Sequence, residues 1–94
     1  MAEIRPYRST PVFDQDRLPR ALRARHDTKP GVWGLIRVIT GQLKLTLLDA
    51  AGAPVAELIL TPASPGRIAP QQPHFVTPIG PMQMQIDFYD QPPP

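Results

Sequence analysis

The chain contains two histidines, His26 and His74, and no cysteine. Imidazole is the commonest protein ligand for zinc, nickel, iron and copper, and it binds through a neutral ring nitrogen. His26 lies in "RARHDTK", where charged and uncharged residues alternate. If the segment is a strand, His26 points inward and the charged residues, Asp27 among them, face water. His74 opens an apolar strand after "APQQP". The two residues could share a metal site only if these distant segments meet. The alternative is a pair of ordinary histidines, hydrogen-bonded at the protein surface.

Four other side chains have types that suit a binding site. Trp33 and Tyr89 could line a pocket, although aromatic residues in central strands more often serve packing. Arg37 interrupts an apolar strand and could contact an anionic ligand or Asp87, with a surface ion pair as the favoured role. Lys29, next to Pro30, is expected to be an exposed turn residue.

The sequence offers no catalytic residues. Ser9 and Ser64 lie in turns without a neighbouring base, and no pair of carboxylates flanks an obvious cleft. Neither a P-loop nor a GxGxxG motif is present. The pattern therefore favours neither a nucleophilic nor a nucleotide-dependent enzyme.

Length and composition indicate one domain that spans residues 1–94, with an ordered core over about 7–89 and a proline-rich tail at 90–94. The net charge is +2, and seven of the ten basic residues fall within the first 29 positions beside four acidic ones. Such a neutralised cluster does not favour a nucleic-acid partner. No signal peptide or membrane-spanning segment is recognisable, so a cytoplasmic location without membrane contact is expected.

The secondary-structure elements that carry these candidate residues are predicted to be mostly short strands. "DQDRLPRALRA" predicts one helical turn, with Asp16 as a possible N-cap and Pro19 as an early helical residue. Val32 to Thr40 predicts a central strand, and Gly41-Gln42 a tight hairpin turn into the strand "LKLTLLD". Further strands are predicted at "VAELILT", "GRIAP", "HFVTPIGP" and "MQMQIDFYD". The last of these alternates apolar and polar residues, and the closing "QPPP" is expected to fray. Seven or eight short strands with turn residues between them predict an all-β sandwich or barrel.

Several of these segments together resemble a known family. "STPVFDQDRLP", "RHDTKPGVWGLIRVITGQLKL", "APVAELILTP", "PQQPHFV" and "IDFY" occur in the order found in the cupin-like domain of tellurite-resistance methyltransferases. That domain also occurs as small stand-alone bacterial proteins of unclear function. The resemblance covers about Tyr7 to Tyr89, and the chain is expected to represent the stand-alone form, without room for a methyltransferase.

The resemblance implies a cupin-type, double-stranded β-barrel of the jelly-roll type and a divalent metal. By position, His26 matches the first histidine of the first cupin motif, and His74 matches the histidine of the second. The position of the second histidine holds Thr28, and that of the glutamate falls near Trp33 or Gly34, so two of the usual four ligands remain. Asp87 is the best-placed third ligand by family position. The alternation of the last strand nevertheless turns Asp87 away from the core.

Three functions follow as hypotheses. The favoured one is a small binding module with an optional divalent metal (zinc, nickel or iron) at His26 and His74, with a link to tellurite or other oxyanion stress implied by the resemblance. The alternatives are a metal-dependent cupin enzyme of the oxygenase or isomerase type, and a protein-interaction module with a vestigial pocket. The incomplete ligand set disfavours the enzyme. A homodimer is also expected, because two-sided apolar strands leave surface to cover.

Overall fold

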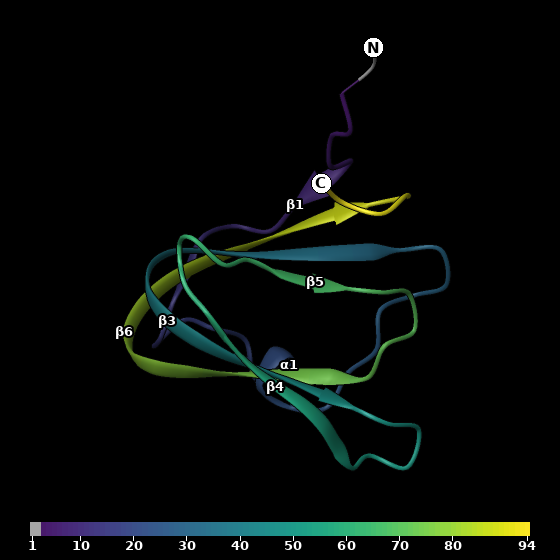
Figure 1. Cartoon of the computed structure of the whole chain (residues 1–94). Helices are drawn as coiled ribbons and strands as arrows, with labels where there is room; N and C mark the ends of the chain where they lie inside the picture. Colours follow the sequence, from purple (N-terminus) through teal and green to yellow (C-terminus); the bar gives the residue numbers. More distant parts are fainter. Residues whose placement is uncertain (1–2) are drawn as a thin grey trace.

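A computed structural model describes residues 3–94. The described chain forms one antiparallel sheet of six strands and a single turn of helix (Figure 1). The elements, in order, are β1 (Arg8–Ser9), β2 (Phe13–Asp14), α1 (Arg20–Arg23), β3 (Trp33–Leu48), β4 (Pro54–Leu60), β5 (Gly66–Ile68) and β6 (His74–Tyr89). The prediction of a nearly all-β protein is confirmed.

Two strands of 16 residues, β3 and β6, form the frame of the fold. They pair with each other along their whole length, from Trp33 opposite Tyr89 to Leu47 opposite His74. Both strands curve at mid-length, so that each contributes to two facing layers (Figure 1). The register of β3 on β6 shifts between Val38 and Gln42, which is where the bend falls.

The predicted hairpin at Gly41-Gln42 is therefore wrong. Gly41 has a φ of +78° and lies inside β3, at the irregularity where the strand bends. The segments "HFVTPIGP" and "MQMQIDFYD" likewise form one strand, β6, with Gly80 at a φ of +65°. A bulge with a left-handed residue bends a strand without reversing it. The predicted seven or eight short strands are thus six, two of them long.

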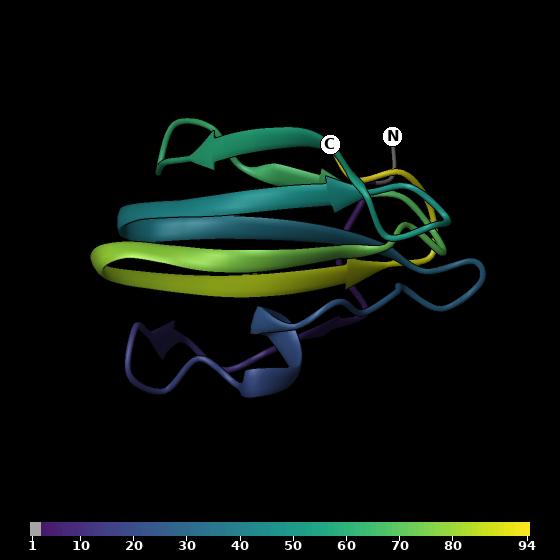
Figure 2. The same cartoon turned by 90° about the horizontal axis from the view of Figure 1, so that it is seen from below.

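The remaining strands extend the two layers. The main strand order is β1-β6-β3-β4, while β2 pairs with β6 and β5 pairs with β3. In Figure 2 the N-terminal segment and α1 lie beside β6, on the side away from β4. The sheet is open, because β4 pairs only with β3 among the described strands. The cupin-type, double-stranded β-barrel of the jelly-roll type stays a prediction from the resemblance.

The core lies between the two layers. The predicted inward alternation of the last strand is confirmed, because Met82, Met84 and Ile86 are at most 6% exposed and Phe88 packs against them. Leu18, which precedes α1, and residues of β3, β4, β5 and β6 complete the cluster: Ile36, Val38, Leu43, Leu45, Leu60, Ile68 and Val76. This core fixes which side chains of β3 and β6 remain available to line a site.

The helical turn is where it was predicted, but its start differs. Asp16 is not the cap: the carboxylate of Asp14 accepts hydrogen bonds from the main-chain N–H groups of Asp16 and Arg17. Pro19 occupies the N-cap position of α1 without a side-chain hydrogen bond. An aspartate that bonds the backbone two and three residues ahead stabilises a turn before the helix.

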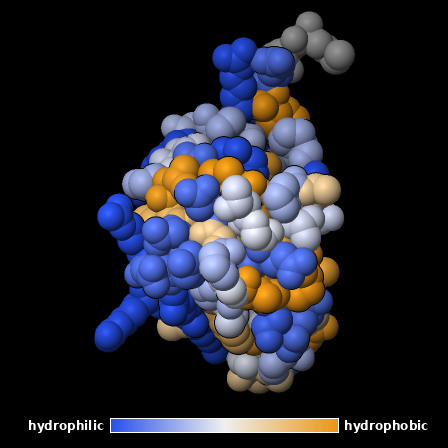
Figure 3. Space-filling view, turned by 90° about the vertical axis from the view of Figure 1, so that its left-hand side faces the viewer, coloured by the Kyte–Doolittle hydropathy of each residue, from blue (hydrophilic) through white to orange (hydrophobic). Residues whose placement is uncertain are grey.

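The surface is mixed in character. The end of the molecule at which β3 and β6 bend shows apolar patches among hydrophilic residues (Figure 3). The tail predicted to fray instead contacts the sheet, because the Arg67 guanidinium donates hydrogen bonds to the main-chain oxygen of Pro94 at 2.6 and 3.1 Å. Over residues 3–94, no helix has the length and apolar content to cross a membrane.

Candidate functional site

The two histidines lie side by side. His26 and His74 form an isolated antiparallel bridge, in which the N–H of each donates to the carbonyl of the other at 3.0 Å. Their ring centroids are 4.0 Å apart with an angle of 60° between the ring planes. The predicted meeting of the two segments is confirmed. Whether the pair holds a metal stays a prediction.

The main chain orients both imidazoles. The Nδ1 atom of His26 lies 3.0 Å from the carbonyl oxygen of Ala24, and that of His74 lies 2.7 Å from the carbonyl oxygen of Gln72. A carbonyl only accepts hydrogen bonds, so Nδ1 is assigned as the protonated nitrogen in each ring. The lone pair of each neutral ring is then on Nε2. A backbone carbonyl that fixes the tautomer in this way is a usual partner of metal-binding histidines.

The environment keeps His74 neutral. Its side chain is buried, and desolvation is the main cause that lowers the pKa of its imidazole. The hydrogen bond to Gln72 opposes this shift, and the neighbouring His26 adds to it. A neutral imidazole is the form that binds a metal ion. Near neutral pH, His74 is thus already in the protonation state that a metal requires.

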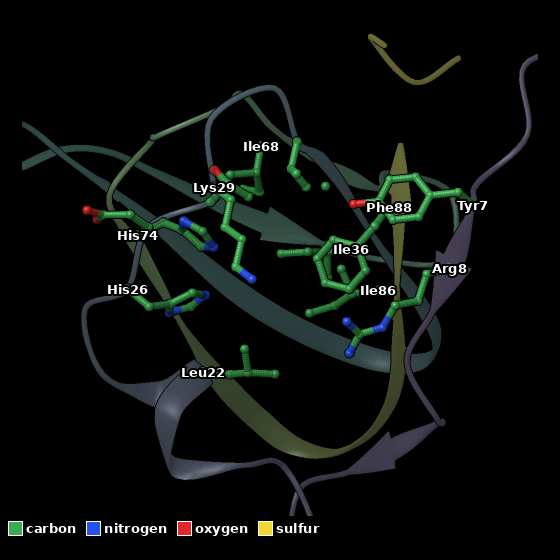
Figure 4. A pocket seen from close by; sticks show the side chains of 14 residues that line it. Tyr7, Arg8, Leu22, His26, Lys29, Ile36, Ile68, His74, Ile86 and Phe88 are labelled. Carbon is green, nitrogen blue, oxygen red and sulfur yellow. The ribbon is translucent and has the colours of Figure 1, made fainter. Parts of the chain in front are cut away.

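The histidines form one end of a cavity of about 250 Å³ (Figure 4). Its floor comes from the core, and its rim comes from the N-terminal arm and the segment after α1. The lining residues are Tyr7, Arg8, Leu22, His26, Asp27, Thr28, Lys29, Val32, Gly34, Ile36, Ile68, His74, Ile86 and Phe88. Most of the exposed surface of this lining is apolar, as is usual in small-molecule sites, and the charged side chains come from the N-terminal arm and the segment after α1.

Three charged residues line this pocket although the sequence did not predict them as site residues. Lys29 was expected to be a plain turn residue, and Asp27 was expected to face water with the other charged residues of its segment. Both line the cavity, as does Arg8 from β1. The guanidinium carbon of Arg8 lies 5.5 Å from the centre of the Phe88 ring. Only the pairing of β1 with β6, which brings Arg8 opposite Phe88, places this arginine at the pocket.

The aromatic pair considered for the pocket is elsewhere. Trp33 and Tyr89 are directly opposite each other in the β3–β6 ladder and do not line the cavity. Tyr89 is 4% exposed, which agrees with the packing role that its position in a central strand favoured. Tyr7 and Phe88 are the aromatic residues at the pocket instead.

Asp87 is held away from the histidines. Its carboxylate accepts hydrogen bonds from the Arg37 guanidinium at 2.6 and 3.2 Å and from the Ser9 hydroxyl at 2.7 Å. Burial alone would raise the pKa of the Asp87 carboxyl, but the bonds from Arg37 and Ser9 outweigh it and lower that pKa. Of the two partners considered for Arg37, the structure shows Asp87, and the pair is half-buried because the Asp87 side chain is 6% exposed. Among residues 3–94, no group of three or more His, Cys, Asp or Glu side chains has the arrangement of a metal site.

The fold is an open antiparallel sheet of six strands, and its pocket is lined by two histidines. The chain belongs to the TehB-like domain family, whose model matches residues 8–86. It is 40% identical over 62 residues to the probable S-adenosyl-L-methionine-dependent methyltransferase TehB of two Haemophilus influenzae strains. That match covers 66% of this chain and 22% of the TehB sequence, so the chain spans about a fifth of these relatives.

Solved structures show the same fold. The crystal structure of TehB from Haemophilus influenzae superposes with a TM-score of 0.86 at 35% identity, and the match covers 93% of this chain and 31% of that one. A protein from Escherichia coli strain K12 superposes with a TM-score of 0.81 at 23% identity and is covered over 96% of its length. The second likeness concerns the fold alone. It shows that this fold also occurs in a protein of nearly the same size.

Proposed function

We propose that the protein is a small-ligand binding module whose His26–His74 pair holds a divalent metal such as zinc, nickel or iron. The observation that carries this proposal is the pairing of two imidazoles, 4.0 Å apart, whose Nδ1 atoms both face main-chain carbonyls. This arrangement leaves the two Nε2 atoms available as ligands at one end of a cavity. The setting we propose from the family resemblance is tellurite or other oxyanion stress.

The donor set fits a metal that keeps open positions. Two imidazoles supply two of the usual four ligands, and water or a bound molecule would complete the shell. Asp27 is the carboxylate that shares the pocket, but the described residues do not assemble it with the histidines into a three-ligand group. When bound, the metal would act as a Lewis acid toward an oxygen-bearing ligand. A weakly held ion supports reversible binding better than turnover, so a binding module is preferred over an oxygenase or isomerase.

Metal binding is tested by titrating the EDTA-treated protein with zinc and nickel in a calorimeter. The parent is expected to bind one ion per chain and to melt at a higher temperature with the metal. In His26→Ala and His74→Ala the dissociation constant should rise by about tenfold or more, because even residues that only support a metal ligand contribute 10–100-fold. Lys44→Ala is the matched control, because Lys44 pairs with Glu57 outside the pocket.

His26→Ala is the decisive variant. His74 is 4% exposed and its replacement can destabilise the domain, whereas His26 is only partly buried and its main-chain bonds to His74 do not need its ring. Circular dichroism should show that His26→Ala is folded. A parent that takes up neither zinc nor nickel, or a folded His26→Ala that binds as tightly as the parent, would contradict the metal proposal.

We also propose that two copies associate through β4. This edge strand pairs on one side only among the described strands, and it exposes Val55 (63%), Leu58 (44%) and Ile59 (50%). Leu58 and Ile59 are consecutive residues of the strand, so their side chains lie on opposite faces of the sheet. Each face of this edge therefore exposes an apolar side chain. Edge strands of this kind are prone to pair with another chain.

Light scattering should give about twice the chain mass of 10.4 kDa. A charge on an edge strand opposes pairing, so Ile59→Lys is expected to give a monomer. Val12→Lys changes an equally exposed apolar residue outside β4 and should remain a dimer. A parent that stays monomeric at high concentration, or a dimer that survives Ile59→Lys, would rule out this interface.

A further inference from the structure

Besides the histidine pair, the pocket contains two cationic side chains, Arg8 and Lys29. Arg8 and Lys29 reach over the cavity from opposite sides, Arg8 from β1 and Lys29 from the segment before β3 (Figure 4). Among residues 3–94, no carboxylate forms a salt bridge with either of them. Two cationic side chains at one small cavity, with no ion-pair partner, form a site for a negatively charged group.

Beneath these cations the lining is apolar. Ile36 and Ile68 are each 1% exposed, Ile86 is 6% exposed, and Phe88 lies under the Arg8 guanidinium. The stacking of Arg8 on Phe88 holds the guanidinium near the ring and leaves its N–H groups free to donate. A ligand that contacts both the two cations and the apolar floor needs one anionic group and one apolar group.

The volume of the cavity limits the size of the apolar part of the ligand. This volume of about 250 Å³ is below the ~300 Å³ at which drug-sized pockets begin. This corresponds to a single ring or a short chain with a carboxylate. The apolar floor offers no partners to the additional charges of nucleotides and other multiply charged metabolites.

We infer that the pocket binds a small organic monocarboxylate, with the carboxylate between Arg8 and Lys29 and the apolar body against Ile36, Ile68 and Ile86. This inference rests on the proposal that the cavity is a ligand site, but it does not need a bound metal. Guanidinium and ammonium groups donate charge-assisted hydrogen bonds to a carboxylate, which are about twice as strong as neutral ones. Asp27, the one carboxylate in the lining, opposes the anion and sets two cations against one acid.

Benzoate, its neutral analogue benzamide, and acetate are suitable probes. Binding is followed by NMR in the presence of EDTA, with reporter signals from the pocket. Benzoate is expected to bind at least about tenfold more tightly than benzamide, which lacks the charge. It should also bind more tightly than acetate, which lacks the apolar body.

Single substitutions measure how much each charged residue of the pocket contributes to benzoate binding. Arg8→Gln and Lys29→Gln should each weaken benzoate binding by about tenfold and leave benzamide binding unchanged. Asp27→Asn should strengthen benzoate binding, because it removes the repulsion. Lys44→Gln is the control, because it removes an exposed cation outside the pocket. All four positions are at least partly exposed, so these variants are expected to fold.

The outcomes distinguish this inference from the metal proposal. Benzoate that binds in EDTA and loses affinity in Arg8→Gln and Lys29→Gln supports the inference, even if no metal is taken up. Equal binding of benzoate and benzamide, or no binding of either, overturns it. Benzoate that binds only after zinc is added, and equally in both variants, would place the carboxylate on the metal and also overturn it.

Discussion

Replacing Gly41 with alanine is expected to lower the free energy of unfolding by about 4 kcal/mol, a large part of the total stability of a domain of this size. Gly41 has a φ of +78°, a left-handed conformation that costs a residue with a Cβ about 1–2 kcal/mol. An added Cβ would also lie 2.4 Å from the carbonyl oxygen of Pro81 and 2.9 Å from the Cα of Met82. Both are main-chain atoms, so the two bent strands must separate to make room. Overpacking of this kind costs about 1–3 kcal/mol more.

Gly80 is the matched control for this prediction. It lies at the corresponding bend of β6 with a φ of +65°, but an added Cβ there would meet nothing within 4 Å. Gly80→Ala should therefore cost only the conformational part, about 1–2 kcal/mol. Urea denaturation of both variants measures the difference. Equal losses in the two variants would show that the close approach of β3 and β6 at Gly41 does not limit the fold.

The same glycine explains why the strands were only partly predictable. A hairpin turn and a bend within a strand both favour glycine between apolar runs, because both use a positive φ. What separates them is the partner: β3 beyond Gly41 pairs with Thr77 and Val76 of β6, distant residues that no local pattern specifies. The alternation of "MQMQIDFY" was readable because it needs only a period of two and a buried face. The division of β6 into the two predicted strands "HFVTPIGP" and "MQMQIDFYD" has the same local origin.

The histidine pair could be predicted from the sequence, whereas the place of the charged residues Arg8 and Asp27 at the pocket could not. His26 was found because it occupies an inward position in an alternating segment, and His74 because the family resemblance relates it to His26. The position of Arg8 depends instead on the short strand β1, whose two residues give no periodic signal. Asp27 was assigned to solvent by the alternation, but its segment forms only the single bridge at His26, so the rule of alternating faces does not extend to it.

Arg37 and Asp87 form the second place where one substitution should have a large effect. The Asp87 side chain is 6% exposed, whereas that of Arg37 is 44% exposed. Removal of Arg37 would leave a buried carboxylate with the Ser9 hydroxyl as its remaining side-chain partner. Loss of one member of a buried pair typically costs 3–5 kcal/mol. Because Arg37 is partly hydrated, we expect Arg37→Met to cost about 3 kcal/mol at neutral pH, at the lower end of that range.

The pH dependence identifies the cause of this loss. In the parent, the lowered pKa of Asp87 gives stability that is present above the ordinary carboxyl value of 3.8 and is lost as the pH falls through the lowered pKa. Without Arg37, burial dominates and should raise the pKa of this carboxyl above its ordinary value. The unfolded chain then releases the proton at a lower pH than the folded chain does. The variant should therefore regain stability as the pH falls through the raised pKa, where the parent is still fully stabilised.

The quantity to measure is the difference in free energy of unfolding between parent and Arg37→Met, from urea denaturation at several pH values. It should be largest near neutral pH and should shrink in acid. Lys44→Met is the control: it breaks the exposed pair with Glu57, which is 3.7 Å apart, and should cost less than about 0.5 kcal/mol at every pH. A difference for Arg37→Met that does not change with pH would mean that Arg37 stabilises β3 by packing its side-chain methylenes, and that the charge of Asp87 is not the cause.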